Sequence, residues 1–428
     1  MELSKSRVNN FIEDYPTDLD AKITGKKAEV GVIGVGYVGQ ALVQSLTSAG
    51  FKTFGYDLDE NKLRTIKDEL FTGFTSVESL EYSDVICVCV PTPLDSQRKP
   101  DLTFLMKAIE DLAKFRSQKQ LIIVESTVAP GTLRKIVLPS LEKYGRRHGS
   151  DFHLALSPER VDPGNRTFAL KNTPKIIGGV GETATRLASL FYSKFIDQVV
   201  VTSTPEVAEL TKMLENTFRL VNISLMNEIK IYAEKAGIDI WEAIDAASTK
   251  PYAFMAHYPG PGVGGHCIPI DPVYLLESAK EEAIDLSILR SALKVNEMQP
   301  GLIIQQAKKI LNGRLNGKRA KMLVVGIAYK PSSSDTRESP AIRIIEIAES
   351  EGFEVTYFDP LVPRLNGHSS QMLTRELLRK QDVIIIATHH PNVQYELIRE
   401  SGVPVIDTRN IMKDIEKKTA YQPEESEA

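Results

Sequence analysis

The chain has 428 residues, of which 42% are hydrophobic and 25% charged, and its formal net charge is −4. This length predicts two or three domains, and the composition is that of a soluble globular protein. Without a basic field, nucleic acid is excluded as the main partner, and no apolar run approaches the roughly 18 residues that span a bilayer. Three cysteines make no disulfide framework, so we expect a cytoplasmic protein without a metal site.

The first part of the chain predicts a nucleotide-binding type of fold. Residues 1–27 are polar and predict a partly helical extension. From residue 28, a Val/Ile run passes into glycines, an apolar helical pattern and a second strand, which is a βαβ unit. Further strands are expected in 84–91, 120–127 and 152–159. The alternation predicts an α/β class, with a doubly wound, mostly parallel sheet over residues 28–204.

Three glycines in this βαβ unit predict a dinucleotide site. Gly34, Gly36 and Gly39 form GxGxxG, which allows a tight turn, close approach of a pyrophosphate and close packing of helix on strand. Asp57 ends the next strand, where a carboxylate binds the adenosine ribose and repels a 2′-phosphate, so we expect NAD rather than NADP. Lys62 either lies over the same ribose or is a solvated helix lysine.

A long helix is predicted after residue 204. Apolar positions recur three and four apart over more than thirty residues, with Thr204 as a plausible N-cap and Gly237 as a stop. A helix of this length commonly packs against another copy of itself. We therefore expect a homodimer built on a central helical domain, residues 205–315.

Two polar residues on this helix are candidates for catalysis. Lys212 and Asn216 are four apart and leave one helix face, where an ammonium and an amide can stabilise an alkoxide or oxyanion. On a polar surface they would only be solvated. Arg219 extends the stripe and suggests an anionic ligand.

The strand–helix pattern restarts near Lys318 and predicts a second Rossmann-like domain over residues 316–428. The stretches 352–359 and 380–391 echo 50–57 and 82–93. After the first strand of this domain stands VVGIAYKPSSSDTRESP instead of GxGxxG, so no second dinucleotide is expected there. The tail from residue 416 predicts disorder.

Cys267 lies in the loop YPGPGVGGHCIPIDP. Gly264 and Gly265 give its thiol the backbone freedom and access that a nucleophile needs, whereas the alternative is a small buried residue. Asp271, four residues later, either caps the next helix or relays a proton.

Several other polar side chains follow strands or lie in turns. Thr127, Glu159 and Arg160 come at strand ends, where α/β sheets bind ligands. Lys330 and Arg337 lie in a Ser/Thr-rich turn suited to phosphate oxygens. Each of them also fits a structural role.

Together these motifs resemble the UDP-glucose/GDP-mannose dehydrogenase family. They occur in family order from about residue 28 to 412: GxGxxG with Asp57, VPTP, ESTVAPGT, SPERVDPGN, AELTKMLENTFRLVN, GPGVGGHCIPIDP, GIAYKPSSSDTRESP and DTRN. The resemblance implies a four-electron oxidation of a sugar C6 alcohol with two NAD, through a thiohemiacetal and a thioester on Cys267. It also implies that the second Rossmann-like domain holds the UDP half, and that the product is a uronic sugar for surface polysaccharide.

The resemblance also assigns roles residue by residue. The catalytic set is Cys267, Lys212, Asn216, Asp271, Thr127 and Glu159. The NAD set is Gly34, Gly36, Tyr37, Val38, Gly39, Asp57, Lys62, Pro91, Thr92, Thr127 and Arg337. The nucleotide-sugar set is Glu159, Arg160, Val161, Lys212, Asn216, Arg219, Tyr258, Gly262, Gly264, Lys330 and Arg409.

Within the family, the motifs resemble the branch that oxidises N-acetylated hexosamines. Pro163 stands where the UDP-glucose branch tends to carry an acidic residue, and Pro251-Tyr252-Ala253 stands where UDP-N-acetylmannosamine enzymes carry His-Pro-Arg. The expected substrate is therefore UDP-N-acetylglucosamine, with UDP-N-acetylmannosamine and UDP-glucose as alternatives. More remote alternatives are a single-oxidation hydroxyacid dehydrogenase and a non-catalytic nucleotide-sugar binder.

Overall fold

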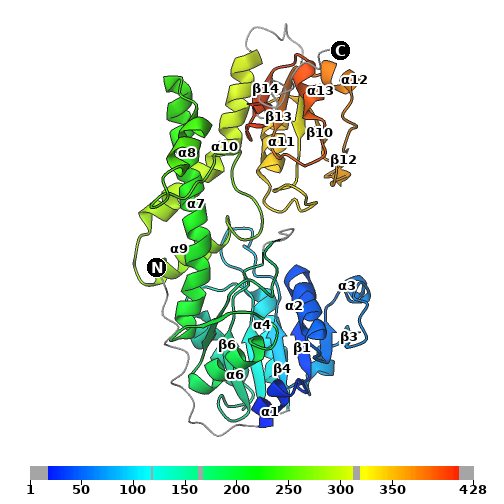
Figure 1. The fold of residues 1–428 in the computed structure, drawn as a ribbon, viewed down its shortest axis with the longest axis vertical. Coiled ribbons are helices and arrows are strands. Elements are labelled where there is room, and N and C mark those ends of the chain that lie inside the picture. Colours follow the sequence, from blue (N-terminus) through cyan, green and yellow to red (C-terminus); the bar gives the residue numbers. More distant parts are fainter. Residues whose placement is uncertain (1–17, 117–118, 162–166, 312–318, 414–428) are drawn as a thin grey trace, which may run out of the picture. The chain divides into compact units, whose positions relative to one another are not determined.

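A computed structural model describes residues 18–116, 119–161, 167–311 and 319–413 (Figure 1). The chain divides into two compact units, 1–212 and 213–428, called here the N-terminal and C-terminal units. Most of the expected N-terminal extension, Pro163 and the tail from residue 416 lie outside the described residues.

The N-terminal unit is built on an eight-stranded sheet of order β3-β2-β1-β4-β5-β6-β7-β8. Its strands are β1 (Val30–Ile33), β2 (Thr53–Tyr56), β3 (Phe71–Phe74), β4 (Val85–Val88), β5 (Gln120–Val124), β6 (Phe152–Leu156), β7 (Lys175–Gly179) and β8 (Val199–Val201). The first six in chain order are parallel, but β7 pairs antiparallel with β6, and β8 follows β7. The predicted doubly wound, mostly parallel sheet is confirmed.

Helices cover both faces of this sheet, as the strands' burial requires. They are α1 (Asp18–Thr24), α2 (Tyr37–Ser48), α3 (Glu60–Arg64), α4 (Thr103–Ala113), α5 (Leu138–Glu142) and α6 (Glu182–Tyr192), with short turns of other pitch at Val77–Leu80 and Leu133–Val137. Side chains of α1, α2 and α6 share one core cluster with the strands, and those of α4 and α5 share another. Alternate strand residues point into each core.

Two features of the first core concern expectations from the sequence. Leu19 and Ile23 of α1 are buried in it, so residues 18–24 of the expected extension are part of the N-terminal unit. Cys87 lies in this cluster, Cys89 is half-buried and packs against it, and neither forms a disulfide. The two strand cysteines are small core residues, as the sequence predicts.

A pair of half-buried histidines should make the stability of this unit depend on pH. The rings of His148 and His153 lie 6.0 Å apart, and His148 Nε2 and His153 Nδ1 are buried without hydrogen-bond partners. Burial lowers the pKa of both imidazoles below the usual value of 6.5. Below that value the unfolded chain takes up protons that the folded chain does not, so stability falls as the pH falls.

We therefore expect the unfolding temperature to drop as the pH falls from neutral through 6.5, the histidine reference value. His148→Phe keeps the edge-to-face contact with Phe152 and removes one titrating group, so the drop should become smaller. Scanning calorimetry of both proteins at several pH values measures this. A variant with an unchanged pH dependence would contradict the assignment.

The long helix α7 (Pro205–Ala236) crosses from the N-terminal unit into the C-terminal unit. The Thr204 hydroxyl accepts from the Val207 amide, and Gly237 has φ 71°, so both predicted ends are confirmed. One face is buried, through Glu209, Lys212, Met213, Asn216, Leu220, Ser224 and Asn227. Helical period places these residues on one stripe.

The rest of the C-terminal unit begins with α8 (Ile240–Ser248), α9 (Asp271–Glu281) and α10 (Ser287–Leu311). Ser224 of α7 donates to the carbonyl of Ala292 in α10, beside a cluster formed by Leu220, Leu289 and Ala292. None of the helices in the described ranges is both long and apolar enough for a membrane span.

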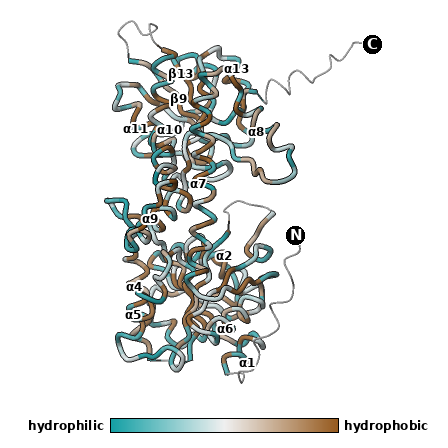
Figure 2. The backbone as a smooth tube through the Cα atoms, turned by 90° about the vertical axis from the view of Figure 1, so that its left-hand side faces the viewer, coloured by the Kyte–Doolittle hydropathy of each residue, from teal (hydrophilic) through white to brown (hydrophobic). Residues whose placement is uncertain are grey.

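The C-terminal unit also contains a second parallel sheet, of order β10-β9-β13-β14. Its elements are β9 (Lys321–Val325), α11 (Pro340–Ser350), β10 (Glu354–Phe358), β11 (Arg364–Leu365), β12 (His368–Ser369), α12 (Arg375–Arg379), β13 (Val383–Ile386), α13 (Tyr395–Glu400) and β14 (Val405–Asp407). Helices α10 and α11 cover one face and α12 and α13 the other, and Figure 2 shows β9 and β13 as hydrophobic segments. The predicted second Rossmann-like fold is confirmed.

Candidate functional site

The GxGxxG turn has the backbone that a dinucleotide site needs. Gly34 follows β1 with φ 88°, and a Cβ on Gly39 would lie 2.0 Å from the Gly34 carbonyl oxygen, so packing requires both glycines. A Cβ on Gly36 would meet nothing within 4 Å, so the protein's own packing does not require the second glycine. The open space there, at the uncapped N-terminus of α2, fits a pyrophosphate.

Asp57 follows β2 and completes this turn. Its Oδ2 accepts from the Val35 amide at 2.9 Å, and its Oδ1 accepts from the Asp59 amide at 2.9 Å. Lys62 Nζ lies 3.2 Å from Oδ1. The carboxylate is thus fixed beside the glycine turn, with Lys62 over it, as binding of a ribose diol by Asp57 requires.

The other residues expected around NAD lie at the carboxyl edge of this sheet or on α2, except Arg337, which belongs to the C-terminal unit. Tyr37 begins α2 and is 52% exposed, and Val38 is half-buried behind it. Pro91 is exposed, whereas Thr92 is buried and its hydroxyl donates to the Thr127 carbonyl at 2.8 Å. Thr92 therefore joins the loop after β4 to the loop after β5.

The second Rossmann-like domain has a similar glycine and aspartate after its first two strands, but it has no open space for a nucleotide beside them. Gly326 has φ 78° and Asp359 follows β10, in the positions of Gly34 and Asp57. Asp359 Oδ2, however, accepts from the Ile327 and Ala328 amides, and from His390 at 3.1 Å, and its side chain is 0% exposed. Ala328 and Pro331 stand where the first domain has Gly36 and Gly39, and no helix begins before Pro340. The carboxylate is sealed, so this turn cannot bind a ribose.

Glu159 follows β6 and is held by its own turn. Its Oε1 accepts from the Arg160 amide at 2.7 Å and from the Val161 amide, and its Oε2 lies 3.4 Å from Lys175 Nζ. Burial alone would raise the pKa of Glu159, but the Lys175 ammonium and the two amides hold it below its usual value. The Arg160 guanidinium donates to the Pro174 carbonyl, which ties this turn to β7.

Lys212 lies against this turn. Its side chain is 8% exposed, and its Nζ donates to the Glu159 carbonyl at 2.5 Å. One turn earlier, the buried Glu209 carboxylate accepts from the amides of Gly131 and Leu133, which anchors α7 to the loop after Thr127. Burial raises the pKa of Glu209 to about 7. The Glu159 carbonyl therefore holds the ammonium of Lys212, and Glu209 holds the helix turn before it.

The cysteine loop in the C-terminal unit is rigidly held around an exposed thiol. A Cβ on Gly264 would lie 2.6 Å from the Glu338 carbonyl, and Gly265 has φ 85° with its amide on the Arg337 carbonyl at 3.0 Å. Gly262 and Gly264 are buried, but Cys267 is exposed. The glycines thus bring the loop close to the turn after β9, while Cys267 stays exposed.

Asn216 and Asp271, 55 residues apart, form a buried pair in this unit. Asn216 Nδ2 donates to Asp271 Oδ2 at 2.5 Å, and the two side chains belong to residues 6% and 2% exposed. Asp271 is the first residue of α9, whose N-cap is Ile270, so it is not the capping residue. Its amide donates to the Cys267 carbonyl, which places the carboxylate and the thiol on one turn.

Two of the expected basic ligands, Arg409 and Lys330, follow strands at the carboxyl edge of the second sheet. Arg409 follows β14, its Nε donates to the Ala387 carbonyl, and a Cβ on Gly260 would lie 2.8 Å from its Nη1. Burial lowers the pKa of Arg409 to about 10, so an anion would stabilise its charged form. Lys330 Nζ lies 5.6 Å from the centre of the Tyr329 ring.

The other two expected binding groups already have protein partners. Arg337 forms an ion pair with Asp335 at 2.6 Å, and that carboxylate raises its pKa. The Tyr258 hydroxyl donates to Asp245 at 2.8 Å, and its ring stacks on Trp241. Arg219 is exposed on α7.

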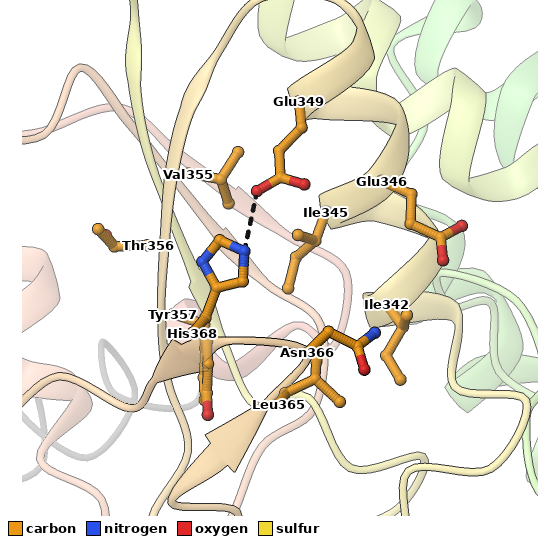
Figure 3. A pocket seen from close by; sticks show the side chains of 10 residues that line it. All are labelled: Ile342, Ile345, Glu346, Glu349, Val355, Thr356, Tyr357, Leu365, Asn366 and His368. Carbon is orange, nitrogen blue, oxygen red and sulfur yellow. Dashed lines mark ion pairs between the residues drawn. The ribbon is translucent and has the colours of Figure 1, made fainter.

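A separate hollow in the C-terminal unit lies between α11, β10 and the β11–β12 hairpin. Figure 3 shows His368 pointing across it to Glu349, with Nε2 3.2 Å from the carboxylate. None of the residues expected for catalysis, NAD or the sugar lines this hollow. It is therefore not part of the candidate site.

Family models match the chain in the order of these parts. The UDP-glucose/GDP-mannose dehydrogenase family matches with its NAD binding domain at residues 68–196, its central domain at 206–298 and its UDP binding domain at 323–414. The chain belongs to this family. Members of the UDP-glucose/GDP-mannose dehydrogenase family are NAD-dependent oxidoreductases, and NAD is the cofactor that the glycine turn fits.

A further model, of the NAD binding domain of D-isomer specific 2-hydroxyacid dehydrogenases, matches residues 9–99. This range ends after β4 and includes the glycine turn, but neither the Cys267 loop nor the second Rossmann-like domain. The match therefore reflects the dinucleotide turn that the two families share.

Relatives of similar length are nucleotide-sugar dehydrogenases. UDP-N-acetyl-D-mannosamine dehydrogenase of Pyrococcus horikoshii is 36% identical over 90% of this chain and 96% of its own length. The solved structure of the UDP-D-ManNAc dehydrogenase from that organism has a TM-score of 0.82 at 35% identity, covering 90% of this chain and 96% of that one. UDP-N-acetyl-D-glucosamine 6-dehydrogenase of Pseudomonas aeruginosa is 31% identical over 79% of this chain and 84% of its own.

The structure adds residues that the sequence patterns do not reveal. Asn227 and Asn296 hold the cysteine loop, since their side-chain oxygens accept from the amides of Gly260 and Val263. Lys175 is buried behind Glu159. Asn227 could have been found from the sequence, because it is a polar residue on the apolar stripe of a helix. No sequence pattern marks Lys175.

Asp57→Asn should weaken NAD binding about 10- to 100-fold, because a hydrogen bond to a charged group contributes about 1.5–3 kcal/mol. The variant should also lose part of the discrimination against NADP, because the charge that repels the 2′-phosphate is gone. Titration of both nucleotides by calorimetry measures the two effects.

Asp359→Asn is the matched control, since Asp359 has the same place in the second domain but is sealed. It should lower stability and leave the affinity for NAD unchanged. Equal losses of NAD affinity in the two variants would contradict the assignment of the nucleotide to the first turn.

Proposed function

We propose that this chain oxidises the C6 hydroxyl of a UDP-N-acetylhexosamine to the uronic acid, with two NAD and covalent capture on Cys267. The observation that carries the proposal is an exposed thiol at the end of a loop whose glycines are buried and hydrogen-bonded. Structural cysteines are commonly buried, so a loop that is fixed and yet presents its thiol fits a nucleophile.

The covalent step follows from the chemistry of a thiolate. Bound NAD accepts the hydride that leaves C6 in each of the two oxidations. The Cys267 sulfur adds to the carbonyl carbon of the sugar aldehyde, and the carbonyl electron pair moves to oxygen. After the second hydride leaves, a thioester remains, and attack of water on its carbonyl carbon releases the carboxylate and the thiolate.

The neighbouring polar groups have complementary tasks in this proposal. Lys212 and Asn216 stabilise the negative oxygen of the alkoxide and of the tetrahedral adducts, because both are side-chain donors on one helix stripe. Asp271, paired with Asn216 and on the turn of Cys267, receives the proton of the thiol or of the attacking water. Thr127 and Glu159 serve water and the C6 hydroxyl.

UDP-N-acetylmannosamine is the proposed substrate, because the relatives that cover 90% of this chain or more include several dehydrogenases of that sugar. UDP-N-acetylglucosamine, the epimer expected from the sequence, is the second candidate. Pro251-Tyr252-Ala253 favours it, since this stretch departs from the His-Pro-Arg element.

An NADH assay with UDP-ManNAc, UDP-GlcNAc, UDP-GalNAc and UDP-glucose tests the proposal. We expect two NADH per sugar and the highest kcat/KM for UDP-ManNAc. A single NADH per sugar would indicate a one-step dehydrogenase, and nucleotide-sugar binding without NADH would indicate a non-catalytic binder. If kcat/KM were highest with UDP-GlcNAc, the substrate would be UDP-N-acetylglucosamine and not its manno epimer.

We also propose that α7 pairs two copies of the chain. Seven of its exposed apolar residues are Val207, Leu210, Leu214, Phe218, Leu225, Ile229 and Tyr232, between 37% and 67% exposed. At 3.6 residues per turn they form one stripe, opposite the buried face. Several of them recur at seven-residue spacing, which is typical of paired helices, so a second copy of α7 fits this stripe.

Sedimentation should give a dimer for the native chain at micromolar concentration. Phe218→Asp combined with Leu225→Asp should give a folded monomer, because paired helices would bury two carboxylates in an apolar seam. Leu58→Asp changes an equally apolar residue, 81% exposed and outside α7, and should leave the dimer intact. A native monomer would refute the pairing.

A further inference from the structure

Lys175 is a lysine with almost no access to water. Its side chain is 2% exposed, its Nζ lies 2.5 Å from Glu125 Oε2 and 3.4 Å from Glu159 Oε2, and Glu125 also accepts from the Tyr192 hydroxyl. We propose that Lys175 is a positioning residue: it holds the Glu159 carboxylate, and through the Glu159 turn it fixes the ammonium of Lys212. The inference rests on the proposed function of Lys212 as an oxyanion donor.

The direction of β7 explains why Lys175 reaches this turn. β7 pairs antiparallel with β6, with Ala155 opposite Gly179 and Leu156 opposite Gly178. The same register, continued by three residues, places Lys175 opposite Glu159. A strand parallel to β6 would have its first residue at the amino edge of the sheet, away from the candidate site.

Lys175 and its neighbour Pro174 hold two parts of the Glu159 turn. Its ammonium holds the carboxylate, whose other oxygen accepts the amides of Arg160 and Val161. The carbonyl of its neighbour Pro174 accepts from the Arg160 guanidinium. The turn is thus clamped to the start of β7, and the Glu159 carbonyl, on which Lys212 rests, has one position.

The charge balance of this cluster explains why a buried lysine is retained. Burial disfavours its charged form, but the carboxylates of Glu125 and Glu159 raise the pKa of Lys175, so it stays protonated. A buried ion pair contributes little net stability over well-packed apolar residues, whereas removing one partner leaves uncompensated charge. Orientation of a functional group is a benefit that apolar packing cannot supply.

The test compares Lys175→Met with Arg146→Met. Arg146 is also a buried base of the N-terminal unit, 6% exposed, but it bonds the Leu112 carbonyl and Gln120 at the amino edge of the sheet. Both variants lose a buried charge, so both should unfold at a lower temperature. Assays are run well below either transition.

Lys175→Met should lower kcat about 10- to 100-fold with KM values for both substrates within about threefold, since a misplaced oxyanion donor acts on the transition state. The isotope effect on kcat with a C6-deuterated sugar should rise, because hydride transfer becomes limiting. Arg146→Met should leave kcat and the isotope effect unchanged. A native kcat in Lys175→Met, or an equal loss in both variants, overturns the proposal.

Labelling of Lys212 with an amine-reactive reagent, followed by mass spectrometry, gives a readout that needs no activity. Lys212 should react several-fold faster in Lys175→Met than in the native chain or in Arg146→Met. If the native protein oxidised no nucleotide sugar, the proposed function would fail, while faster labelling would still support the positioning role. Unchanged labelling overturns it. If Lys175→Met does not fold, the double variant Lys175→Met with Glu125→Gln replaces it, because it removes one buried charge of each sign. The same kcat, isotope-effect and labelling results then decide.

Discussion

Replacing Cys267 by serine should stop formation of the uronic acid, with a fall in its rate of about a thousandfold or more, because a hydroxyl is a far weaker nucleophile than a thiolate. The first oxidation should still occur, so the product mixture should contain aldehyde and at most one NADH per sugar. NAD affinity should be native, since the glycine turn lies in the N-terminal unit. Product analysis by mass spectrometry, with NADH counted by absorbance, measures this.

The Cys267→Ser substitution should leave the conformation of the cysteine loop unchanged. The cysteine loop is held by backbone contacts, such as those of Val263 with Asn296 and of Gly265 with Arg337, which serine at position 267 leaves in place. Cys89→Ser is the matched control, because it changes a half-buried thiol that packs against the first core cluster. That variant should retain two NADH per sugar. Full conversion to the acid by Cys267→Ser would refute the covalent step.

Lys212→Met should lower kcat about 100- to 1,000-fold, the usual cost of removing one donor from an oxyanion site. Methionine keeps the volume of the buried stem, so the loss should arise from the missing ammonium on the Glu159 carbonyl. Both oxidations should slow, because each passes through a negatively charged oxygen. Single-turnover kinetics with substoichiometric sugar would resolve the two steps.

Lys230→Met serves as the control on the same helix. Lys230 lies eighteen residues after Lys212, on the same side of α7. It forms an ion pair with Glu234, in which each side chain is at least 25% exposed. Its replacement should leave kcat within about twofold, since exposed pairs contribute little. Comparable losses of kcat in Lys212→Met and Lys230→Met would mean that the loss arises from a disturbed helix and not from the missing ammonium of Lys212.

The glycine turn and α7 follow from local sequence. A positive φ at Gly34 and the 2.0 Å approach at Gly39 are requirements that only glycine meets, so the sequence must show them. The ends of α7 are equally local, since Thr204 caps its first turn and Gly237 takes the left-handed conformation after its last. Period, caps and turns act over a few residues, and a single sequence displays them.

The same local signals predict the second Rossmann-like domain, but they do not show why that domain cannot bind a dinucleotide. The absence of GxGxxG predicts it, and Asp359 shows the cause. Its carboxylate matches Asp57 in sequence, yet it is consumed by backbone amides and His390. Identical residues thus have different accessibility, which depends on the loop that packs over them.

Only the tertiary structure decided which polar groups meet. The pairing of Asn216 with Asp271 and the clamp of Lys175 on Glu159 join residues far apart in the chain, and no periodicity encodes such contacts. The antiparallel direction of β7 matters most, because a Val/Ile-rich strand reads the same in either direction. The sequence therefore determined the fold class and the cofactor turn, and it offered Cys267 as the candidate nucleophile, all of which depend on local backbone chemistry. Strand direction and long-range packing decided the supporting contacts of Lys212, because those contacts depend on register across the sheet.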